Sequence, residues 1–155
     1  MCICLNSIIS NQRDMIREIQ EDDFEKEYMN LINQFTRYPE PISFDTFKET
    51  LAQIKQNRSK IFVIEENGCI VATITCMIEQ KLHNNCKRVA HIEDLVVEEQ
   101  SRKKGYASTL VKKAIDHARN EICYKIVLQT NEDNIGFYEK NGFIKKGIEM
   151  TKYLL

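Results

Sequence analysis

The spacing of apolar residues predicts two helices in the first third of the chain. Residues 14–19 mix apolar and charged side chains without a clear period, which fits a short strand at the edge of a sheet. Across residues 24–35, apolar side chains recur every three or four positions, as on one face of a helix. Ser43 is placed to cap a second helix over residues 44–54, which have the same spacing. Two helices joined by an elbow at residues 36–41 are therefore expected after the first strand.

Strand patterns dominate the middle of the chain. Residues 61–64, 69–78 and 88–97 are rich in apolar and β-branched side chains. The sequence Glu66-Asn67-Gly68 has the composition of a tight hairpin turn, and the polar residues 81–87 form a second connection. Three strands with short polar connections predict an antiparallel meander.

Helices and strands alternate in the last third of the chain. Residues 106–118 carry a helical apolar stripe, and residues 124–128 form a continuous apolar run of the kind that is buried on both faces of a sheet. Residues 134–140 predict a short helix that ends at Asn141-Gly142, a natural left-handed cap. Residues 143–153 are expected to return as the last strand.

The order β-α-α-β-β-β-α-β-α-β predicts an α+β fold, a mixed α/β sandwich in which helices flank a central mixed β-sheet. The length of 155 residues fits one hydrophobic core, and no change in composition divides the chain. We therefore expect residues 12–155 to form a single domain and residues 1–11 to be an N-terminal extension.

Composition narrows the classes of partner. With 22 basic and 23 acidic residues, the net charge of -1 argues against a nucleic-acid or membrane-surface binder. The 6 cysteines are scattered and mostly lie in apolar runs, so we expect reduced thiols, a cytoplasmic protein and no disulfide framework. Their spacing also predicts no metal site. No segment reads as a secretory signal or a transmembrane helix.

One basic turn has the composition of an anion-binding site. Residues 102–107, Arg-Lys-Lys-Gly-Tyr-Ala, follow a predicted strand and open a predicted helix. The free N–H groups and the positive dipole end of such a helix favour a bound anion, so the turn predicts a phosphate or pyrophosphate site.

Four short motifs carry a resemblance to a known family. They are R-x-x-G-x-A at residues 102–107, HIED at 91–94, FYEKNGF at 137–143 and GIEM at 147–150. The first alone is weak, but the set resembles the glucosamine 6-phosphate N-acetyltransferase family of the GNAT superfamily, with similarity from about Thr36 to Met150. The resemblance implies the GNAT acyl-CoA N-acyltransferase fold.

The resemblance also implies an activity. Members of the family are homodimers that move the acetyl group of acetyl-CoA to the 2-amino group of glucosamine 6-phosphate, on the route to UDP-N-acetylglucosamine. The expected reaction is a direct attack in a ternary complex of enzyme, acetyl-CoA and amino sugar.

The resemblance points to three catalytic residues, Glu93, Asp94 and Tyr138. A carboxylate near the substrate amine can hold the ammonium and pass its proton to water, and the Tyr138 phenol can protonate the departing thiolate. Because Glu93 and Asp94 are adjacent on a strand, we expect their side chains to leave opposite faces. The alternative for Asp94 is a structural pairing with a buried Arg or Lys. For His91 the alternative is a place in the core, or one that supports the substrate-contacting residues from behind.

The resemblance assigns the cofactor to the central strand, the basic turn and the penultimate helix. Backbone amides of the strand would pair with the pantetheine arm, and one of them would polarise the thioester carbonyl. The expected cofactor-binding residues are Leu95, Val96, Val97, Arg102, Lys103, Lys104, Gly105, Tyr106, Ala107, Ser108, Asn134 and Tyr138. Arg102 and Ala107 depart from the Gln and Gly that are usual in the family.

The sugar phosphate site carries the larger departures. Gln129-Thr130 stands where the family usually has Asp-Cys, and Tyr153 stands where a C-terminal Arg would reach the phosphate, so we expect a weaker or rearranged phosphate site, with Lys152 as a possible substitute. The expected substrate-binding residues are Thr36, Lys81, Leu82, His83, Asn84, Glu93, Asp94, Tyr124, Lys125 and Tyr153.

Two other functions remain open from the sequence. The same fold could acetylate another amine, such as a protein N-terminus, a lysine or a polyamine. A chain that had lost a catalytic residue would be a silent acyl-CoA-binding module, but Glu93, Tyr138 and the basic turn are all present.

Overall fold

The computed structural model describes residues 15–36 and 39–154. A five-stranded sheet in the order β1-β2-β3-β4-β5 forms the centre of the molecule. All neighbours are antiparallel except β4 and β5, which are parallel, so the predicted mixed sheet is confirmed. The strands are β1 (Met15–Glu18), β2 (Lys60–Glu66), β3 (Cys69–Gln80), β4 (Arg88–Val97) and β5 (Cys123–Leu128).

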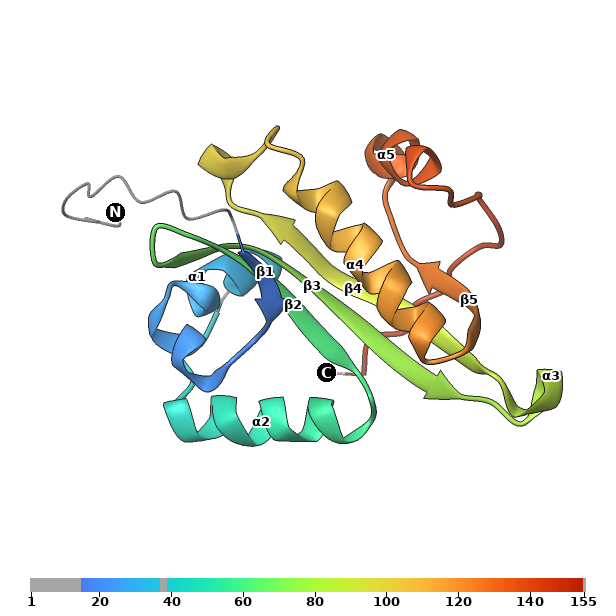
Figure 1. Ribbon diagram of the computed structural model, residues 1–155, viewed down its shortest axis with the longest axis horizontal. Helices are drawn as coiled ribbons and strands as arrows, with labels where there is room; N and C mark the ends of the chain where they lie inside the picture. Colours follow the sequence, from blue (N-terminus) through green and yellow to red (C-terminus); the bar gives the residue numbers. More distant parts are fainter. Residues whose placement is uncertain (1–14, 37–38, 155) are drawn as a thin grey trace.

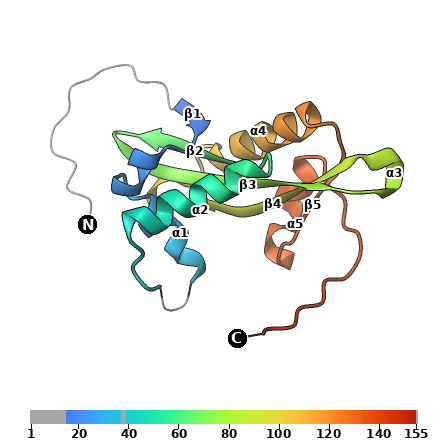
Figure 2. The same ribbon diagram turned by 90° about the horizontal axis from the view of Figure 1, so that it is seen from below.

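Helices cover both faces of the sheet (Figures 1 and 2). The longest, α4, lies on one face, and α1 and α2 lie on the other. The α-helices are α1 (Tyr28–Ile32), α2 (Phe44–Gln56), α3 (His83–Cys86), α4 (Tyr106–Asn120) and α5 (Ile135–Lys140), and the 3-10 helices are η1 (Glu21–Glu25), η2 (Asn33–Phe35), η3 (Glu99–Ser101) and η4 (Glu132–Asn134).

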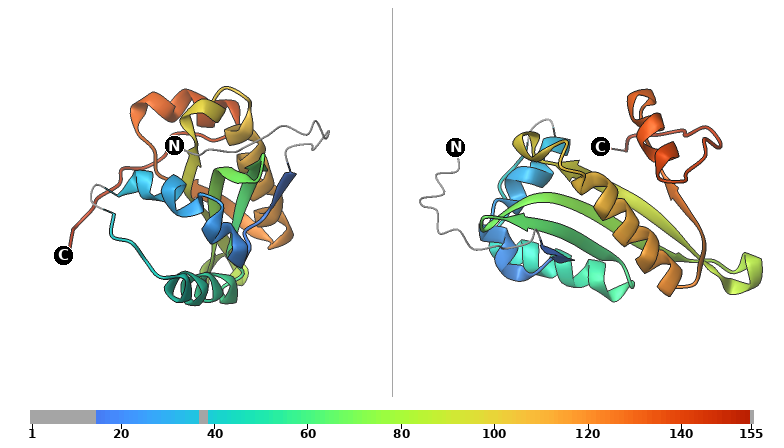
Figure 3. Two further views of the ribbon diagram at one scale, coloured as in Figure 1. Left: turned by 90° about the vertical axis from the view of Figure 1, so that its left-hand side faces the viewer. Right: turned by 45° about the horizontal axis from the view of Figure 1, so that its top comes forward.

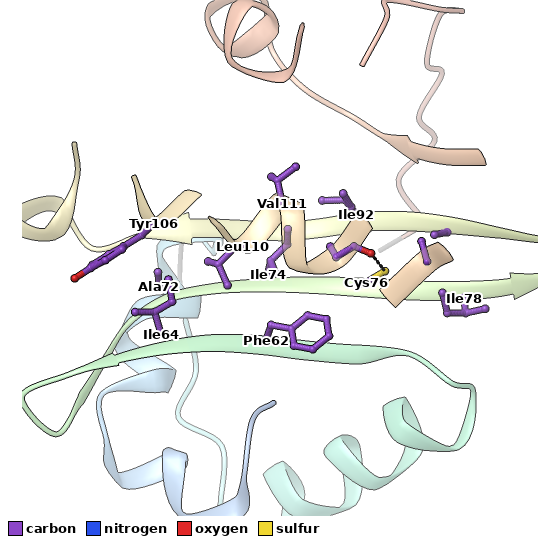
Figure 4. Packing of buried hydrophobic residues seen from close by; sticks show 13 residues of the cluster. Phe62, Ile64, Ala72, Ile74, Cys76, Ile78, Ile92, Tyr106, Leu110 and Val111 are labelled. Carbon is purple, nitrogen blue, oxygen red and sulfur yellow. Dashed lines mark hydrogen bonds between the residues drawn. The ribbon is translucent and has the colours of Figure 1, made fainter. Parts of the chain in front are cut away.

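The sheet separates two hydrophobic cores. On the α4 face, Leu110, Val111 and Ala114 are fully buried against β2, β3 and β4, as Figure 4 shows for the first two. On the other face, Tyr28 and Leu51 pack with residues of β2 and β3. Alternate residues of β2 enter opposite cores, as a period of two requires. In β3 the alternation is broken at its start, where Ile70 and Ala72 enter opposite cores next to a register shift between β2 and β3.

Two hairpins connect the antiparallel strands. Asn67 and Gly68 adopt φ angles of 53° and 82° between β2 and β3, as a tight hairpin turn requires. Between β3 and β4 the chain forms a longer arm with α3 at its tip, where Asn84 and Asn85 also have positive φ. This arm extends away from the body of the molecule (Figure 3).

The first predicted helix is interrupted. Residues 21–25 form a 3-10 turn, and Glu27 has a φ of 66° before α1 begins. The interruption occurs because the Lys26 carbonyl accepts a hydrogen bond from Ile70 N on β3 at 2.8 Å instead of continuing a helix. The fully buried Asp23 fixes the turn, since its carboxylate accepts two hydrogen bonds from Arg17 at 2.6 and 2.7 Å.

Two further predictions are wrong. Strand β5 is not buried on both faces, since none of its six residues is fully buried and its outer edge pairs with no strand of the described chain. Residues 143–153 form no strand but an extended segment that leaves the sheet (Figures 2 and 3). Phe143 packs against the α4-side core, but the apolar side chains that follow it are exposed, and Ile148 is 96% exposed.

Two findings bear on the solution properties of the chain. No helix in residues 15–36 or 39–154 is long and apolar enough to cross a bilayer. Cys69, Cys76, Cys86 and Cys123 carry free thiols, while Cys2 and Cys4 lie outside the described residues.

Candidate active site

The parallel strands β4 and β5 separate partway along their length. Their pairing runs from Arg88 opposite Cys123 to Ile92 opposite Leu128. Strand β4 continues to Val97 but pairs there only with β3. In the described chain, the β5-facing edge of residues 93–97 therefore has no strand partner, and its backbone groups can pair with a ligand.

A β-bulge in β4 places the two acidic residues. Glu93 pairs with Thr75 and Val96 pairs with Thr73, so Asp94 and Leu95 together stand opposite one residue of β3. Asp94 takes a φ of 51° to accommodate the extra residue.

The bulge changes the direction of the side chains. Ile92 and Leu95, three residues apart, both join the α4-side core, whereas Val96 joins the other core. Glu93 lies opposite Thr75, whose hydroxyl donates a 3.2 Å hydrogen bond to Asp94. Both carboxylates therefore lie on the α1 side of the sheet, and the prediction that they leave opposite faces is wrong because the bulge interrupts the alternation.

Two grooves meet at Glu93. The large groove, about 1130 Å³, lies between β5, α5 and the C-terminal segment, and Tyr138 and Gln129 line it. The small groove, about 690 Å³, lies between the end of α2 and strands β3 and β4, and Glu79 lines it. Glu93 and His91 line both. The carboxylate of Glu93 is therefore reachable from both grooves, whereas the predicted cofactor-binding residues 95–97, 102–108 and Asn134 line neither of them.

The electrostatics of Glu93 and Tyr138 are coupled. Partial burial raises the pKa of Glu93, and the negative charge of Asp94 raises it further. Burial also raises the pKa of Tyr138, with a contribution from the charge of Glu93. A carboxyl with a raised pKa is a stronger base than an ordinary glutamate, and the phenol stays protonated at neutral pH.

Tyr138 is held by aromatic packing. Its ring lies 4.9 Å from that of Phe137 and 5.8 Å from that of Phe143, both at steep angles. Helix α5 ends at Lys140, Asn141 is its C-cap, and Gly142 has a φ of 87°, which confirms the predicted left-handed cap. The FYEKNGF motif thus fixes the ring of Tyr138, a residue that lines the large groove.

The basic turn has the geometry of an anion site. Lys103 and Gly105 have φ angles of 66° and 86°, and Gly105 caps α4 without a side-chain acceptor for its first N–H groups. A Cβ added at Gly105 would meet nothing within 4 Å, so the space above the turn is open. No acidic residue lies in the first turn of α4. These features fit the pyrophosphate of a nucleotide-bearing acyl donor.

The predicted sugar-binding residues are only partly brought together. Tyr124 and Lys125 line the large groove with Glu93, and the rings of His83 and Tyr124 lie 6.2 Å apart. The other members line neither groove of the described chain: Thr36 after η2, Lys81, Leu82, His83 and Asn84 at the hairpin tip, Asp94 beside Glu93 on β4, and Tyr153 in the C-terminal segment.

Two partners in the site escaped sequence reasoning. Thr75 orients Asp94, and the Glu79 carboxylate accepts a 3.0 Å hydrogen bond from His91 Nε2. Both lie on β3, and only the pairing register brings them opposite β4. His91 faces the grooves and is not a core residue.

Comparisons with known proteins show which family this chain is similar to. The acetyltransferase (GNAT) family matches residues 13–143. The glucosamine 6-phosphate N-acetyltransferase of Arabidopsis thaliana is 35% identical over 142 residues, which are 89% of this chain and 95% of the relative. The rice enzyme glucosamine 6-phosphate N-acetyltransferase 1 is 31% identical and is covered to 86%.

Solved structures of acetyltransferases have the same fold as this chain. The crystal structure of the Arabidopsis thaliana enzyme superposes with a TM-score of 0.87 at 34% identity and covers 92% of this chain and 99% of that one. An acetyltransferase from Trypanosoma brucei superposes with a TM-score of 0.84 at 27% identity, covering 90% and 99% of the two chains.

Proposed function

Because the chain belongs to the acetyltransferase (GNAT) family, we propose that it transfers the acetyl group of acetyl-CoA to the 2-amino group of glucosamine 6-phosphate. The convergence of Glu93 and Tyr138 on one groove, where β4 separates from β5, carries the proposal. The activity of the relatives supports the amino-sugar phosphate as acceptor. The product would be N-acetylglucosamine 6-phosphate, a precursor of UDP-N-acetylglucosamine.

The residues around Glu93 would handle the amine. The sugar enters as an ammonium ion, and the carboxylate of Glu93 takes one of its protons, directly or through water. Asp94, fixed by Thr75, adds negative charge that stabilises the ammonium and raises the basicity of Glu93. The free amine then attacks the thioester carbonyl, the C–S bond breaks, and the Tyr138 hydroxyl protonates the leaving sulfur. The nitrogen of the new amide gives up its second proton, which restores the Tyr138 phenol, so the reaction ends with a neutral amide and a neutral thiol.

The chain's backbone would hold the acyl donor, which supplies the activated thioester. The free edge of residues 95–97 offers N–H and C=O groups to the amide-bearing pantetheine arm, and one N–H can polarise the thioester carbonyl. Residues 102–108 would cradle the pyrophosphate with the N-terminus of α4. Asn134 precedes α5 and would contact the same arm.

A second copy of the chain would complete the site. The outer edge of β5 is unpaired in the described chain, and Ile148, Met150 and Tyr153 are each about 90% exposed or more. We infer that these features pack against a partner in a homodimer. The partner's C-terminal segment or hairpin tip would then supply cations for the sugar phosphate, and Lys152 is the candidate in place of the missing arginine.

The remaining assignments follow from the same proposal. We infer that residues 12–155 act as one domain and that the protein works in the cytoplasm. The free thiols of the described cysteines and the use of acetyl-CoA support that location.

The test is a thiol-release assay of the purified protein with acetyl-CoA and a panel of amines. We expect turnover with glucosamine 6-phosphate and a lower kcat/KM with glucosamine, because the phosphate contributes binding. An equal kcat/KM for the two sugars would show that the enzyme does not recognise the phosphate. Faster turnover with a lysine peptide or spermidine would show that another amine, not the amino sugar, is the acceptor. No turnover with any amine would show that the chain is an acyl-CoA-binding module without enzymatic activity.

A further inference from the structure

Glu66 contacts the anion-binding turn from outside it. This residue ends β2, and its carboxylate accepts two hydrogen bonds from Lys104 Nζ, at 2.6 Å and 2.8 Å. It also accepts hydrogen bonds from Ser101 Oγ at 3.2 Å and from the Tyr106 hydroxyl at 3.4 Å. One carboxylate thus ties together both ends of the turn, which begins after Ser101 and ends where α4 starts.

The turn needs such support because its backbone is unusual. Lys103 takes a left-handed φ of 66°, which side-chain-bearing residues adopt at a cost. Two other side-chain hydrogen bonds hold its first half: Glu98 accepts from Ser101 N at 3.0 Å, and Arg102 Nε donates to the Val97 carbonyl at 3.2 Å. Glu66 differs from these two in lying on β2, outside the β4–α4 segment that carries the turn.

Glu66 itself stands on a rigid support. It pairs with Cys69 across the tight β2–β3 turn, where Asn67 and Gly68 have positive φ. The carboxylate is mostly covered, with 23% of the side chain exposed, so it is held in one position relative to the turn.

We propose that Glu66 is a positioning residue for the acyl donor: it holds residues 101–106 in the conformation that presents the α4 N-terminus to the pyrophosphate. The inference rests on the proposed use of this turn as the pyrophosphate site. The same carboxylate also holds the Lys104 ammonium at the edge of the turn. Because the ion pair orders the Lys104 side chain before CoA binds, less rotamer freedom is lost on binding.

The proposal and simple charge reasoning predict opposite changes in CoA affinity when Glu66 is neutralised. A carboxylate beside an anion site repels phosphate, so neutralising it would tighten binding if Glu66 only contributed charge. If Glu66 positions the turn, its neutralisation weakens binding, because the turn and Lys104 must then be ordered by the ligand.

The experiment is calorimetric titration of CoA into the wild type and Glu66→Gln. We expect a Kd about fivefold to tenfold higher in the variant, and an unchanged KM for the amine acceptor. Glu99→Gln is the matched control, since it removes the same charge from an exposed position just before the turn. Its Kd should equal that of the wild type or fall slightly. A Kd for Glu66→Gln that is equal to or lower than the wild-type value would overturn the proposal.

Two additional measurements keep the outcome interpretable. Ser101→Ala removes a single hydroxyl donor to Glu66 and should weaken CoA in the same direction, which covers the case in which Glu66→Gln does not fold. S-acetylpantetheine lacks the pyrophosphate, so its KM should be the same in the wild type and Glu66→Gln. An equal rise in KM for both donors would show general damage and refute the positioning role.

The outcomes for the two proposals are separable. Calorimetry with CoA needs no acceptor, so failure to acetylate glucosamine 6-phosphate removes the proposed acceptor and leaves the role of Glu66 in place. Unchanged affinity in Glu66→Gln with normal turnover removes only the positioning role. A wild type that binds no CoA would overturn both.

Discussion

Replacing Tyr138 by phenylalanine isolates one atom of the proposed mechanism. The ring packs between Phe137 and Phe143, and phenylalanine keeps both aromatic contacts. Among the described residues none forms a hydrogen bond with the Tyr138 hydroxyl, so its loss leaves no buried donor or acceptor unpaired. The substitution should therefore change the free energy of unfolding by less than about 0.5 kcal/mol.

The kinetic effect should be far larger than the effect on stability. Without the phenol, the thiolate must leave unprotonated or take a proton from water, and we expect kcat to fall about tenfold to a thousandfold. That loss corresponds to roughly 1.4–4.1 kcal/mol of transition-state stabilisation. The Kd for CoA should stay within about twofold, because the hydroxyl acts on the departing sulfur and not on the bound donor.

The pH dependence gives an independent check. Burial and the charge of Glu93 raise the pKa of Tyr138 above its ordinary value of 10.0, so the hydroxyl remains a proton donor through neutral and moderately basic pH. The wild-type kcat should not decline through ionisation of this group until the pH exceeds about 10.

A change of leaving group completes the assay. With an acetyl arylthioester, whose thiolate is weakly basic, proton donation matters little, and Tyr138→Phe should approach the wild-type rate. Turnover of acetyl-CoA that is unchanged in the variant would remove Tyr138 from the acid role. A proportional loss with both donors would place the effect in packing or in an earlier step.

Four other outcomes follow from the structure. Thr75→Val should release Asp94 and raise KM for the amine about threefold to tenfold with the CoA affinity unchanged, since one hydrogen bond to a charged group is lost; an unchanged KM would show that Asp94 needs no support. Asp94→Asn should move the acid limb of the kcat/KM profile to lower pH, because the charge of Asp94 helps to raise the pKa of Glu93; an unmoved limb would assign it to another group. Burial alone would raise the pKa of Asp23, but hydrogen bonds from its arginine partner outweigh this and hold it below its ordinary value, so its stabilisation is present above the pKa of the unfolded chain and is lost as pH falls through the folded value. Asp23→Asn should accordingly lower stability by about 3–5 kcal/mol at pH 7 and flatten the acid side of a Tm-against-pH curve; a Tm equal to the wild type would refute the buried ion pair. Ile148→Glu should convert the proposed dimer to a monomer in sedimentation, and a wild-type sedimentation coefficient that matches a monomer would contradict the dimer itself.

Local physics made much of the fold predictable. The span of β4 was predicted as residues 88–97 and is confirmed, because its β-branched run is bounded by polar turns on both sides. The cap at Ser43 is confirmed by its 3.1 Å hydrogen bond from Thr46 N, and the Asn67-Gly68 turn by its positive φ angles. Such features depend on residues within a few positions of one another, which the sequence displays directly.

Features that depend on distant parts of the chain were mispredicted. The first helix breaks because Ile70, more than forty positions later, takes the Lys26 carbonyl. The apolar run of residues 124–128 lies at an edge because the C-terminal segment does not pair beside it. An apolar pattern shows that a residue prefers burial, but it does not show which surface is available to bury it.

The sequence by itself determined the order of the elements, the cap and glycine positions that end them, and the motifs that indicate an acetyltransferase. Only the tertiary structure decided how these motifs meet. The bulge at Asp94 turned both carboxylates to one face, and the separation of β4 from β5 opened the groove that Tyr138 shares with Glu93. The physical reason is that pairing register and strand separation are set by contacts between strands far apart along the chain, and a linear pattern with a period of two contains no record of an extra residue.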